Sequence, residues 1–424
     1  MIFSLDILPA AHGDCLLLHY GEPEDTGLMV IDGGPPEVYE THLRPRLEAL
    51  RAARVRGGDP LVIDVLMVSH IDDDHIGGIL AMTRELARDG AERPFRALSV
   101  WHNALGDLLG DDARPLSHSV TAAYGAASLT GEPDVEGLDH TAAMVLASVS
   151  QGLQLRIDAD KLNWPINAEF DGALIEAGQP PEPFDLGFGL TMTVIGPMAP
   201  EIKKLQDEYC DFLKKKENER GRAPVLAAFT DTSIPNLSSI VALVEVDGRT
   251  MLLTGDARGD KIIKGLRQAE LLIHDGPFKV NVLKVPHHGS SRDVETSFFA
   301  AVHADHYVFS GNGLHGNPER ETLAMLLEAR PDAAFTLYFT YPLAVIDAGR
   351  KKDWNKQQAS ERKRRDKAKV EGKDEVSVRP DWSDAEHGLA SFLAARGLPN
   401  ARQAIVEIAE GARHTIDLHD ALTV

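Results

Sequence analysis

Runs of apolar, β-branched residues alternate in the first 90 residues with segments whose apolar side chains have helical spacing. The first three apolar runs are separated by short turns rich in Gly, Pro and Asp, and this arrangement favours an antiparallel meander. The run at 61–68 is almost entirely apolar, so we expect a buried strand there. The expected elements are strands at 2–8, 14–20, 27–31 and 61–68 and helices at 38–54 and 79–88.

The pattern loosens between about residues 92 and 236, where Gly- and Pro-rich stretches separate the periodic segments. We expect much of this part to be a helical insertion that covers a site as a lid. Its expected elements are strands at 97–101 and 190–195 and helices near 119–129, 140–153 and 200–219.

Regular alternation returns between residues 236 and 345. Two apolar runs on either side of Asp247-Gly248 predict a hairpin. Strands and helices then alternate, with polar residues at the strand ends, which is how α/β proteins build their sites. The expected elements are strands at 239–246, 250–254, 271–274, 280–285 and 307–310 and helices at 259–268 and 294–302.

The stretch from Arg350 to Lys373 is highly charged and mostly basic, and this favours a solvated or disordered connector. The alternative is a contact for a phosphate-rich substrate, assisted by Trp354. After this stretch, apolar residues at 404–408 and 413–418 flank Gly411 and predict a last hairpin.

The composition is that of a globular protein with an acidic surface. The chain has 424 residues, 43% of them hydrophobic and 26% charged, and a formal net charge of −21. This charge argues against a protein that coats nucleic acid over its whole surface, although it leaves room for a local basic groove. Cys15 and Cys210 are too few for a disulfide framework. The start of the chain is not a secretory signal and no apolar stretch is long enough to cross a bilayer, so we expect a cytoplasmic protein with no membrane partner.

The strongest chemical signal is the motif His70-x-Asp72-x-Asp74-His75, which lies between the buried strand at 61–68 and the helix at 79–88. Two imidazoles and several carboxylates this close together repel one another unless a cation lies among them. Imidazole and carboxylate suit zinc or a neighbouring transition metal. The alternative is a solvated acidic loop that caps the helix.

Other polar residues follow predicted strands. Asp32 ends the third strand beside two glycines, where it is either a plain turn residue or part of a site. His102 also follows a strand, yet like His118 and His140 it is more typical of an ordinary packing histidine. Further candidates at strand ends are Asp256, His288, Ser290 and His315.

Five motifs in order carry a resemblance to a known family: His12-Gly-Asp-Cys, Ile31-Asp-Gly-Gly, the motif at 70–75, Thr254-Gly-Asp256, and Pro286-His-His-Gly-Ser290. This set resembles the metallo-β-lactamase superfamily and, within it, is most similar to the hydrolase domain of the bacterial competence DNA-uptake channel. The resemblance covers about residues 1–90 and 190–320.

The resemblance implies an α/β fold, an αββα sandwich with metals at one edge of two packed sheets. Residues 1–90 and 190–345 would form the two halves of this domain. Residues 91–189 would be the helical insertion or lid, and residues 346–424 a charged linker with a C-terminal hairpin extension.

The resemblance also implies roles for single residues. His70 and Asp72 would hold one metal, Asp74 and His75 the other, and Asp256 would bridge both. His315 matches the last metal histidine in position. His288 would transfer a proton or be a ligand itself, and proton transfer is the preferred alternative. Asp32 would support the ligand loop and Ser290 would orient His288.

Two departures from the family pattern concern the first metal. Asp72 stands where a histidine is commonest, which makes that site richer in oxygen. The usual histidine before Asp256 is absent, and Asn236, Ser238 or a water would take its place. Two divalent ions are therefore expected, with Zn²⁺ preferred and Mn²⁺ as a competitor.

This metal pair implies a hydrolase in which a water between the metals becomes the attacking hydroxide. Asp74 would orient it and His288 would protonate the leaving oxygen. We expect a phosphodiesterase, which would be a nuclease if nucleic acid is the substrate. The alternatives are a small-molecule ester, lactone or β-lactam hydrolase and a catalytically dead metal-binding interaction module. The sequence leaves the oligomeric state open.

Overall fold

The computed structural model describes residues 1–55, 57–103, 140–178, 183–203, 207, 238–273, 276–372 and 376–423, with only the backbone of 140–150. The expected helix at 119–129, most of the one at 200–219, and Asn236 and His118 lie outside the described residues. Among the described helices, none has both the length and the apolar character that a bilayer span requires.

One sheet is built mainly from the N-terminal part of the chain. Its strand order is β14-β1-β2-β3-β4-β5. The pairs β1–β2 and β2–β3 are antiparallel, which confirms the expected meander, and β3, β4 and β5 are parallel. The bounds are β1 Ile2–Ile7, β2 Leu16–Glu22, β3 Asp25–Ile31, β4 Leu61–Met67, β5 Phe95–Trp101 and β14 His414–Asp417.

The second sheet has the order β13-β12-β11-β10-β9-β8-β7-β6. It is antiparallel from β6 to β9, including the expected hairpin β8–β9, and parallel from β9 to β13. The bounds are β6 Phe184–Asp185, β7 Thr191–Gly196, β8 Val241–Val246, β9 Arg249–Leu253, β10 Phe278–Lys284, β11 Val302–Phe309, β12 Phe335–Phe339 and β13 Gln403–Glu407.

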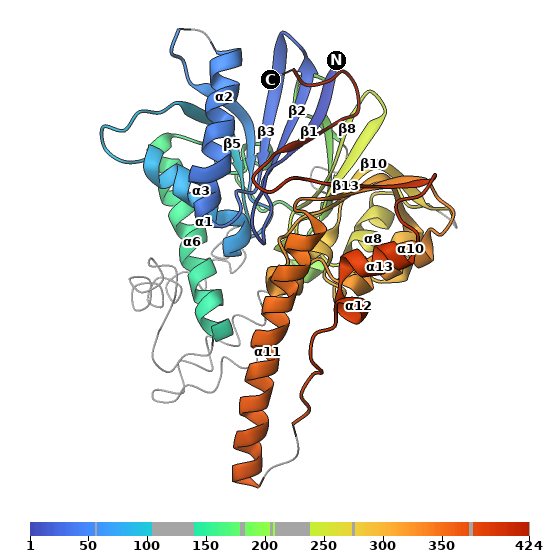
Figure 1. Cartoon of the computed structure of the whole chain (residues 1–424). Coiled ribbons are helices and arrows are strands. Elements are labelled where there is room, and N and C mark those ends of the chain that lie inside the picture. The colour runs from blue at the N-terminus through green and yellow to red at the C-terminus, as the bar shows by residue number, and fades with distance from the viewer. Residues whose placement is uncertain are drawn as a thin grey trace.

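Helices cover the outer face of each sheet (Figure 1). On the first sheet lie α1 Pro36–Val38, a π-helical turn Tyr39–Leu43, α2 Arg44–Arg54, α3 Asp73–Leu86 and α6 His140–Leu162. On the second lie α8 Gly259–Gln268, α9 Thr296–Ala301, α10 Arg320–Ala329 and α13 Leu389–Ala395. The remaining helices are α11 Leu343–Glu371 and α12 Asp384–His387, with 3₁₀ turns at Ala168–Phe170, Pro286–Gly289 and Leu314–Gly316.

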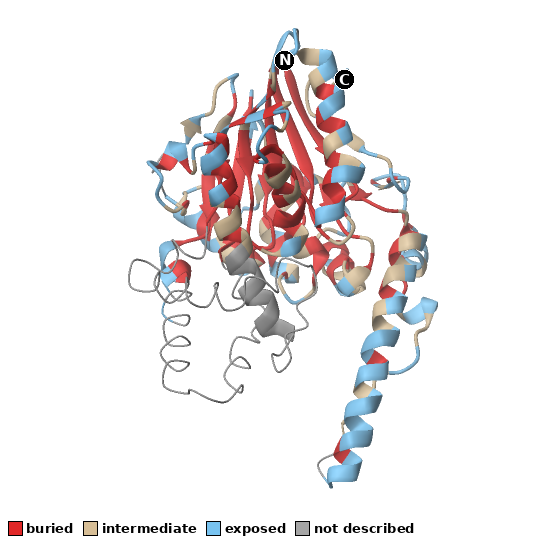
Figure 2. Cartoon of the chain, turned by 90° about the vertical axis from the view of Figure 1, so that its left-hand side faces the viewer, coloured by how far each residue is buried: buried red, intermediate tan, exposed pale blue. Residues whose placement is uncertain are grey.

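Three apolar cores separate these four layers. The central core joins side chains of both sheets, such as Leu18 and Met251. The first outer core packs α2, α3 and α6 on the first sheet, and the second packs α8, α10 and α13 on the other. Most strands are accordingly buried along most of their length, except β6, β13 and β14, whereas the helices bury one side only (Figure 2). The molecule is the expected αββα sandwich.

The C-terminal hairpin prediction is wrong. β13 pairs in parallel with β12, whereas β14 pairs antiparallel with β1 in the other sheet. The turn at Gly411 therefore carries the chain from one sheet to the other. Each strand satisfies its backbone groups on an existing sheet edge and buries side chains against the central core, for example Ile416.

Three other expectations need correction. Residues 350–371 belong to α11 and do not form an irregular connector. Residues 271–273 form no strand, although Leu272 is buried. β5 falls within the expected insertion but is an edge strand of the first sheet. The helix expected at 140–153 continues as α6 to Leu162.

Candidate metal centre

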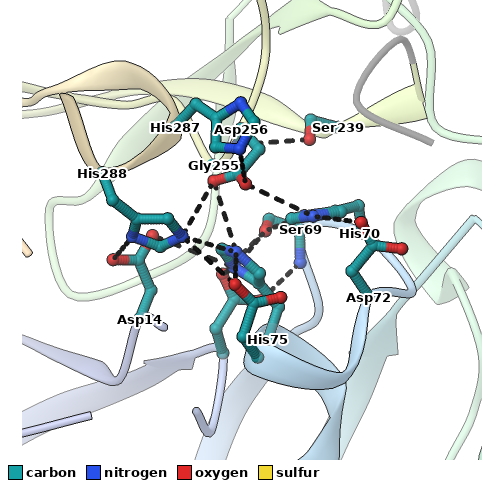
Figure 3. A network of polar contacts seen from close by, with 12 residues as sticks. Asp14, Ser69, His70, Asp72, His75, Ser239, Gly255, Asp256, His287 and His288 are labelled. Carbon is teal, nitrogen blue, oxygen red and sulfur yellow. Dashed lines mark hydrogen bonds and ion pairs between the residues drawn. The ribbon is translucent and has the colours of Figure 1, made fainter. Parts of the chain in front are cut away.

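The candidate site lies where loops leave the carboxyl ends of four strands. Asp32 follows β3, His70 follows β4, Asp256 follows β9, and the pair His287-His288 follows β10. The two sheets bring these ends together at one edge, so that residues far apart in the sequence face one another (Figure 3).

The motif at 70–75 is divided between a turn and a helix. His70 and Asp72 lie in the turn, but α3 begins at Asp73, so Asp74 and His75 occupy its first turn and not the preceding loop. The nearby loop passes very close to α3: the backbone N–H of Gly33 donates to the carbonyl of His75 at 2.8 Å. A Cβ on Gly78 would lie 2.0 Å from the carbonyl oxygen of Gly33, so only glycine fits there.

Four side chains surround one point of the centre, which we call the inner pole. Nε2 of His75 lies 3.2 Å from Nε2 of His288 and 3.3 Å from Oδ1 of Asp256 (Figure 3). Nε2 of His288 lies 3.4 Å from that oxygen and 3.5 Å from Oδ2 of Asp74. Nε2 of His75 lies 3.9 Å from the same Asp74 oxygen. Ligands of a tetrahedral zinc ion are separated by roughly 3.4 Å, so these donors are spaced for one divalent cation.

A second set of side chains, which we call the outer pole, faces the other oxygen of Asp256. Oδ2 of Asp256 lies 3.8 Å from Nε2 of His70 and 3.4 Å from Nε2 of His287. Nε2 of His70 lies 3.6 Å from Oδ2 of Asp72. Nε2 of His70 and Oδ1 of Asp256 are buried and have no hydrogen-bond partner among the described residues. Unsatisfied buried donors and acceptors of this kind fit cation ligands.

Each of the four histidines is held through its other ring nitrogen. Nδ1 of His75 lies 2.9 Å from Oδ2 of Asp32, and Nδ1 of His287 lies 2.6 Å from Oδ2 of Asp293. The remaining two are held by serines: Ser69 is 3.2 Å from Nδ1 of His70, and Ser310 is 2.8 Å from Nδ1 of His288. Metal-binding histidines are commonly oriented in this way.

The loop that carries His70 is fixed by Asp32. Its carboxylate accepts hydrogen bonds from the backbone N–H and the hydroxyl of Ser69, both at 2.7 Å. Asp32 has a positive φ of 58°, which turns its side chain from the end of β3 toward this loop. The structure thus places Asp32 against the ligand loop, where the resemblance implied it would be.

Two residues do not lie where the resemblance implied. His315 is exposed, and its ring lies 5.0 Å from that of His12, edge to face, instead of joining the residues around Asp256. Ser290 accepts a hydrogen bond from the backbone N–H of Arg292 at 3.4 Å, and Ser310 takes the expected place beside His288. Proton transfer was the preferred role for His288, but its position in the inner pole favours the alternative, a ligand.

Sequence reasoning missed Asp14 and Lys284. Oδ2 of Asp14 lies 2.5 Å from Nζ of Lys284, and both side chains are almost completely buried. Oδ1 of Asp14 lies 3.5 Å from Nδ1 of His288, and Asp14, His75, Asp256 and His288 offer donor atoms within 4.8 Å of one another. The signal was present, because Asp14 stands in the first quoted motif, but no role was assigned to it there.

Comparison with known proteins bears on the segment that carries the motif. Residues 10–119 match the family model described as the metallo-beta-lactamase superfamily. This segment is therefore similar to that superfamily. The match includes Asp14, Asp32 and the motif at 70–75, and it ends before Asp256 and the two histidines of the β10 loop.

The other comparisons add little to this assignment. A comparison with curated proteins gave no match. A solved structure similar to this chain is Zn(2+)-bound PqqB from Methylobacterium extorquens, with 12% sequence identity over 98% of this chain and 100% of that one and a TM-score of 0.37. A likeness this low supports no inference about this chain. The finer resemblance to the competence-channel hydrolase stays a prediction.

The charges of the site also favour a bound cation. Burial raises the pKa of Asp256, but the imidazoles of His288, His287 and His75 outweigh it and hold that pKa well below its usual range. Burial lowers the pKa of His75, but Asp256, Asp74 and Asp32 raise it well above its usual value. For His287, Asp256 and Asp293 outweigh burial and raise the pKa to about 9. Carboxylates held ionised and imidazoles with high proton affinity are a donor set that fits divalent metal ions.

Proposed function

We propose that this protein is a metal-dependent phosphodiesterase whose substrate is nucleic acid or a nucleotide. The superfamily match and the His/Asp cluster support the coarser conclusion, a metal-dependent hydrolase. The choice of a phosphodiester depends on one further observation, a large cavity beside the outer pole.

This cavity, which we call the groove, has a volume of about 780 Å³. It begins at His287 and His315 and extends to the base of α11 and the segment 379–387. A volume of this size accommodates a ligand of nucleotide size or larger. The groove therefore gives room for the parts of a substrate that lie on either side of a scissile bond at the metal centre.

Cationic and aromatic side chains line the groove. Arg258 and Arg292 lie on the side of the metal centre, where their guanidinium groups would bind the non-bridging oxygens of a phosphodiester. Trp354 of α11 and Trp382 lie at the far end, with ring centroids 5.9 Å apart. Bases stack on such rings with little regard to sequence. This combination of arginines near the centre and tryptophans beyond it favours a nucleotide-bearing diester.

The roles of the chain's own residues follow from their positions. When bound, the metals would activate water and stabilise negative charge on the substrate. Asp74, whose side chain is 22% exposed, would orient the attacking water. His315 is exposed at the start of the groove and would give a proton to the leaving oxygen. The ion pair of Asp14 with Lys284 would fix the ring of His288 from behind.

A second candidate is a small-molecule ester, lactone or β-lactam hydrolase. Four carboxylates, those of Asp293, Glu319, Glu321 and Asp353, also line the groove. Together with the net charge of −21 they disfavour long polyanions, so a short or uncharged substrate would meet less repulsion.

A substrate panel separates the two candidates. Purified protein is loaded with Zn²⁺ or Mn²⁺ and given labelled single- and double-stranded DNA, RNA, bis-p-nitrophenyl phosphate and a chromogenic β-lactam. We expect cleavage of the diesters, and its loss in Asp256→Asn. The double variant Arg258→Ala/Arg292→Ala should raise KM for a dinucleotide about tenfold or more. Arg88→Ala, an exposed change in the turn after α3, is the control. Cleavage of only the β-lactam would overturn the proposal.

A further inference from the structure

The outer pole lacks the histidine that the superfamily pattern would supply before Asp256. Among the described residues, the side chains facing Oδ2 of Asp256 there are His70 and His287. His287 lies in the quoted motif at 286–290, but the sequence analysis assigned a role only to its neighbour His288. The question is whether His287 is a ligand or only a member of a salt-bridge network.

The backbone presents His287 and His288 to different oxygens of one carboxylate. His287 (φ 46°, ψ 52°) and His288 (φ 50°, ψ 18°) are both left-handed, and Gly289 follows with φ 83°. A non-glycine residue in this conformation is strained and persists where its surroundings enforce it, often at functional sites. As a result, His288 faces Oδ1 of Asp256 and His287 faces Oδ2 (Figure 3).

The two poles then have the same composition. The inner pole contains His75, His288 and Asp74 around Oδ1 of Asp256. In the outer pole, His70 and His287 face Oδ2 of the same residue, and Asp72 lies beside His70, with its Oδ2 3.6 Å from Nε2 of that histidine. Two imidazoles, one carboxylate of its own and one shared carboxylate form a four-ligand set of the kind that zinc accepts.

Asp293 supports this role for His287. Its Oδ2 lies 2.6 Å from Nδ1 of His287, so it accepts the Nδ1 proton and leaves the Nε2 lone pair directed at Asp256 and the outer pole. Asp293 is itself fixed, because its carbonyl accepts a hydrogen bond from the backbone N–H of Gly259 at 2.7 Å. The same arrangement holds His75, with Asp32 in the place of Asp293.

We propose that His287, oriented by Asp293, is a ligand of a divalent metal at the outer pole, in place of the histidine that the sequence lacks. The His287 side chain is 27% exposed and lines the groove, so the outer metal lies on the substrate side of the centre. This inference concerns metal binding alone and does not depend on the substrate class proposed above.

The number of metal ions that the protein binds tests the proposal without any substrate. The full-length protein is stripped with a chelator, reloaded with Zn²⁺ and analysed by elemental mass spectrometry and calorimetric titration. We expect two equivalents for the wild type and one for His287→Ala. Asp293→Asn should weaken the second equivalent by about 10- to 100-fold, the usual effect of losing such a partner. His315→Ala, also beside the groove, should keep two equivalents with the wild-type dissociation constants.

A thiolate variant gives a spectroscopic test that remains valid if His287→Ala folds poorly. His287→Cys, loaded with Co²⁺, should bind two equivalents and show a thiolate-to-cobalt charge-transfer band in the near ultraviolet. One equivalent in the wild type, two unchanged equivalents in His287→Ala, or no such band in His287→Cys would each overturn the proposal. A protein that binds two metals through His287 but cleaves no diester would overturn only the proposed function.

Discussion

At the scale of the residue, the centre depends on contacts that leave no space for larger side chains. Asp32, in the loop after β3, holds both Ser69 and His75. Reciprocal backbone hydrogen bonds join this loop to α3, from Gly33 to His75 and from Gly78 to Gly34, both at 2.8 Å. The position of a ligand therefore depends on backbone packing as much as on its own side chain.

Gly78→Ala tests this dependence. Its Cβ would lie 2.0 Å from the carbonyl oxygen of Gly33, a clash that only backbone movement can relieve. We expect a loss of about 1–3 kcal/mol in the free energy of unfolding and weaker Zn²⁺ binding, measured by denaturation and calorimetric titration. Gly276→Ala is the control, because an added Cβ there meets nothing within 4 Å. Wild-type metal affinity in Gly78→Ala would contradict the argument.

A buried histidine outside the centre makes stability depend on pH. Nδ1 of His19 lies 2.9 Å from Nη2 of Arg54, and its Nε2 lies 3.3 Å from Oδ2 of Asp6. Burial lowers the pKa of His19 to about 4, although Asp6 opposes it. The unfolded chain, with a pKa near 6.5, binds the proton first, so this residue's contribution to stability is present above pH 6.5 and is lost as the pH falls toward 4.

His19→Gln should therefore flatten the acid side of the stability curve. Between pH 7 and 4.5, the wild type should lose about 2–3 kcal/mol more unfolding free energy than the variant. The measurement is urea denaturation at both pH values. If the wild type and His19→Gln lose the same unfolding free energy between these pH values, His19 does not take up the proton on unfolding.

The sequence could predict the motif at 70–75 because its chemistry is local: four donor residues lie within one strand–helix connection. It could not assign Asp14, His287 or Ser310, since each owes its role to a partner on a distant loop. His315 illustrates the opposite error. It has the expected order along the chain, but it is exposed, lines the groove and packs its ring against His12.

At the scale of the element, periodicity identified most strands and helices but not their partners. The runs at β13 and β14 were correctly predicted as strands and wrongly paired with each other. A short turn between two strands favours a hairpin, yet both strands found longer-range partners on existing sheet edges. Pairing of this kind is decided by the tertiary structure and is not encoded in the local pattern.

The high charge of α11 is the reason that the sequence pattern did not predict it as a helix. Its outer half carries few apolar residues, so the charge pattern favoured a connector. Packing at its start fixes the helix: a Cβ on Gly349 would lie 2.3 Å from the carbonyl oxygen of Asn312. Farther out, the returning segment holds it, because Glu361 accepts hydrogen bonds from the backbone N–H and the side chain of Arg379 at 2.6–2.9 Å.

Glu361→Gln should loosen the outer half of α11. The change removes the charge from a contact in which the Arg379 side chain and backbone N–H both bond the Glu361 carboxylate, so a small loss in the free energy of unfolding is expected. Amide hydrogen exchange in residues 355–371 should become several-fold faster. Glu371→Gln, which affects an exposed pair with Lys367 at 3.9 Å, is the control and should change exchange little. If amide exchange in residues 355–371 is equally slow in Glu361→Gln and Glu371→Gln, the contact with Arg379 does not support the helix.

At the scale of the whole molecule, the C-terminal segment joins the two sheets. β13 extends the second sheet and β14 the first, and the N-terminal amine donates a hydrogen bond to Asp420 at 2.6 Å. The two chain ends thus lie close together at one side of the sandwich (Figure 1). The metal centre, at the edge where both sheets meet, depends on this connection for the relative position of its two halves.

The distribution of charge is the other property of the whole molecule. α11 carries ten basic and five acidic residues in a chain with a net charge of −21. It projects from the sandwich with its base at the groove and is mostly exposed (Figure 2). A positive projection on an acidic body would attract a polyanion to one place only, beside the metal centre.

This arrangement predicts that the charges of α11 cause a dependence of kcat/KM on salt concentration. If the substrate is single-stranded nucleic acid, log(kcat/KM) should fall linearly with log[NaCl]. Neutralising three exposed residues of α11, Lys363, Arg364 and Arg365, by alanine should reduce the slope by about 2, because each phosphate contact contributes roughly 0.7. The control triple, Arg88, Arg93 and Arg96 to alanine, removes the same exposed charge elsewhere and should leave the slope unchanged. Equal slopes in all three proteins would exclude α11 as a contact and would favour a substrate short enough to be held by the groove alone.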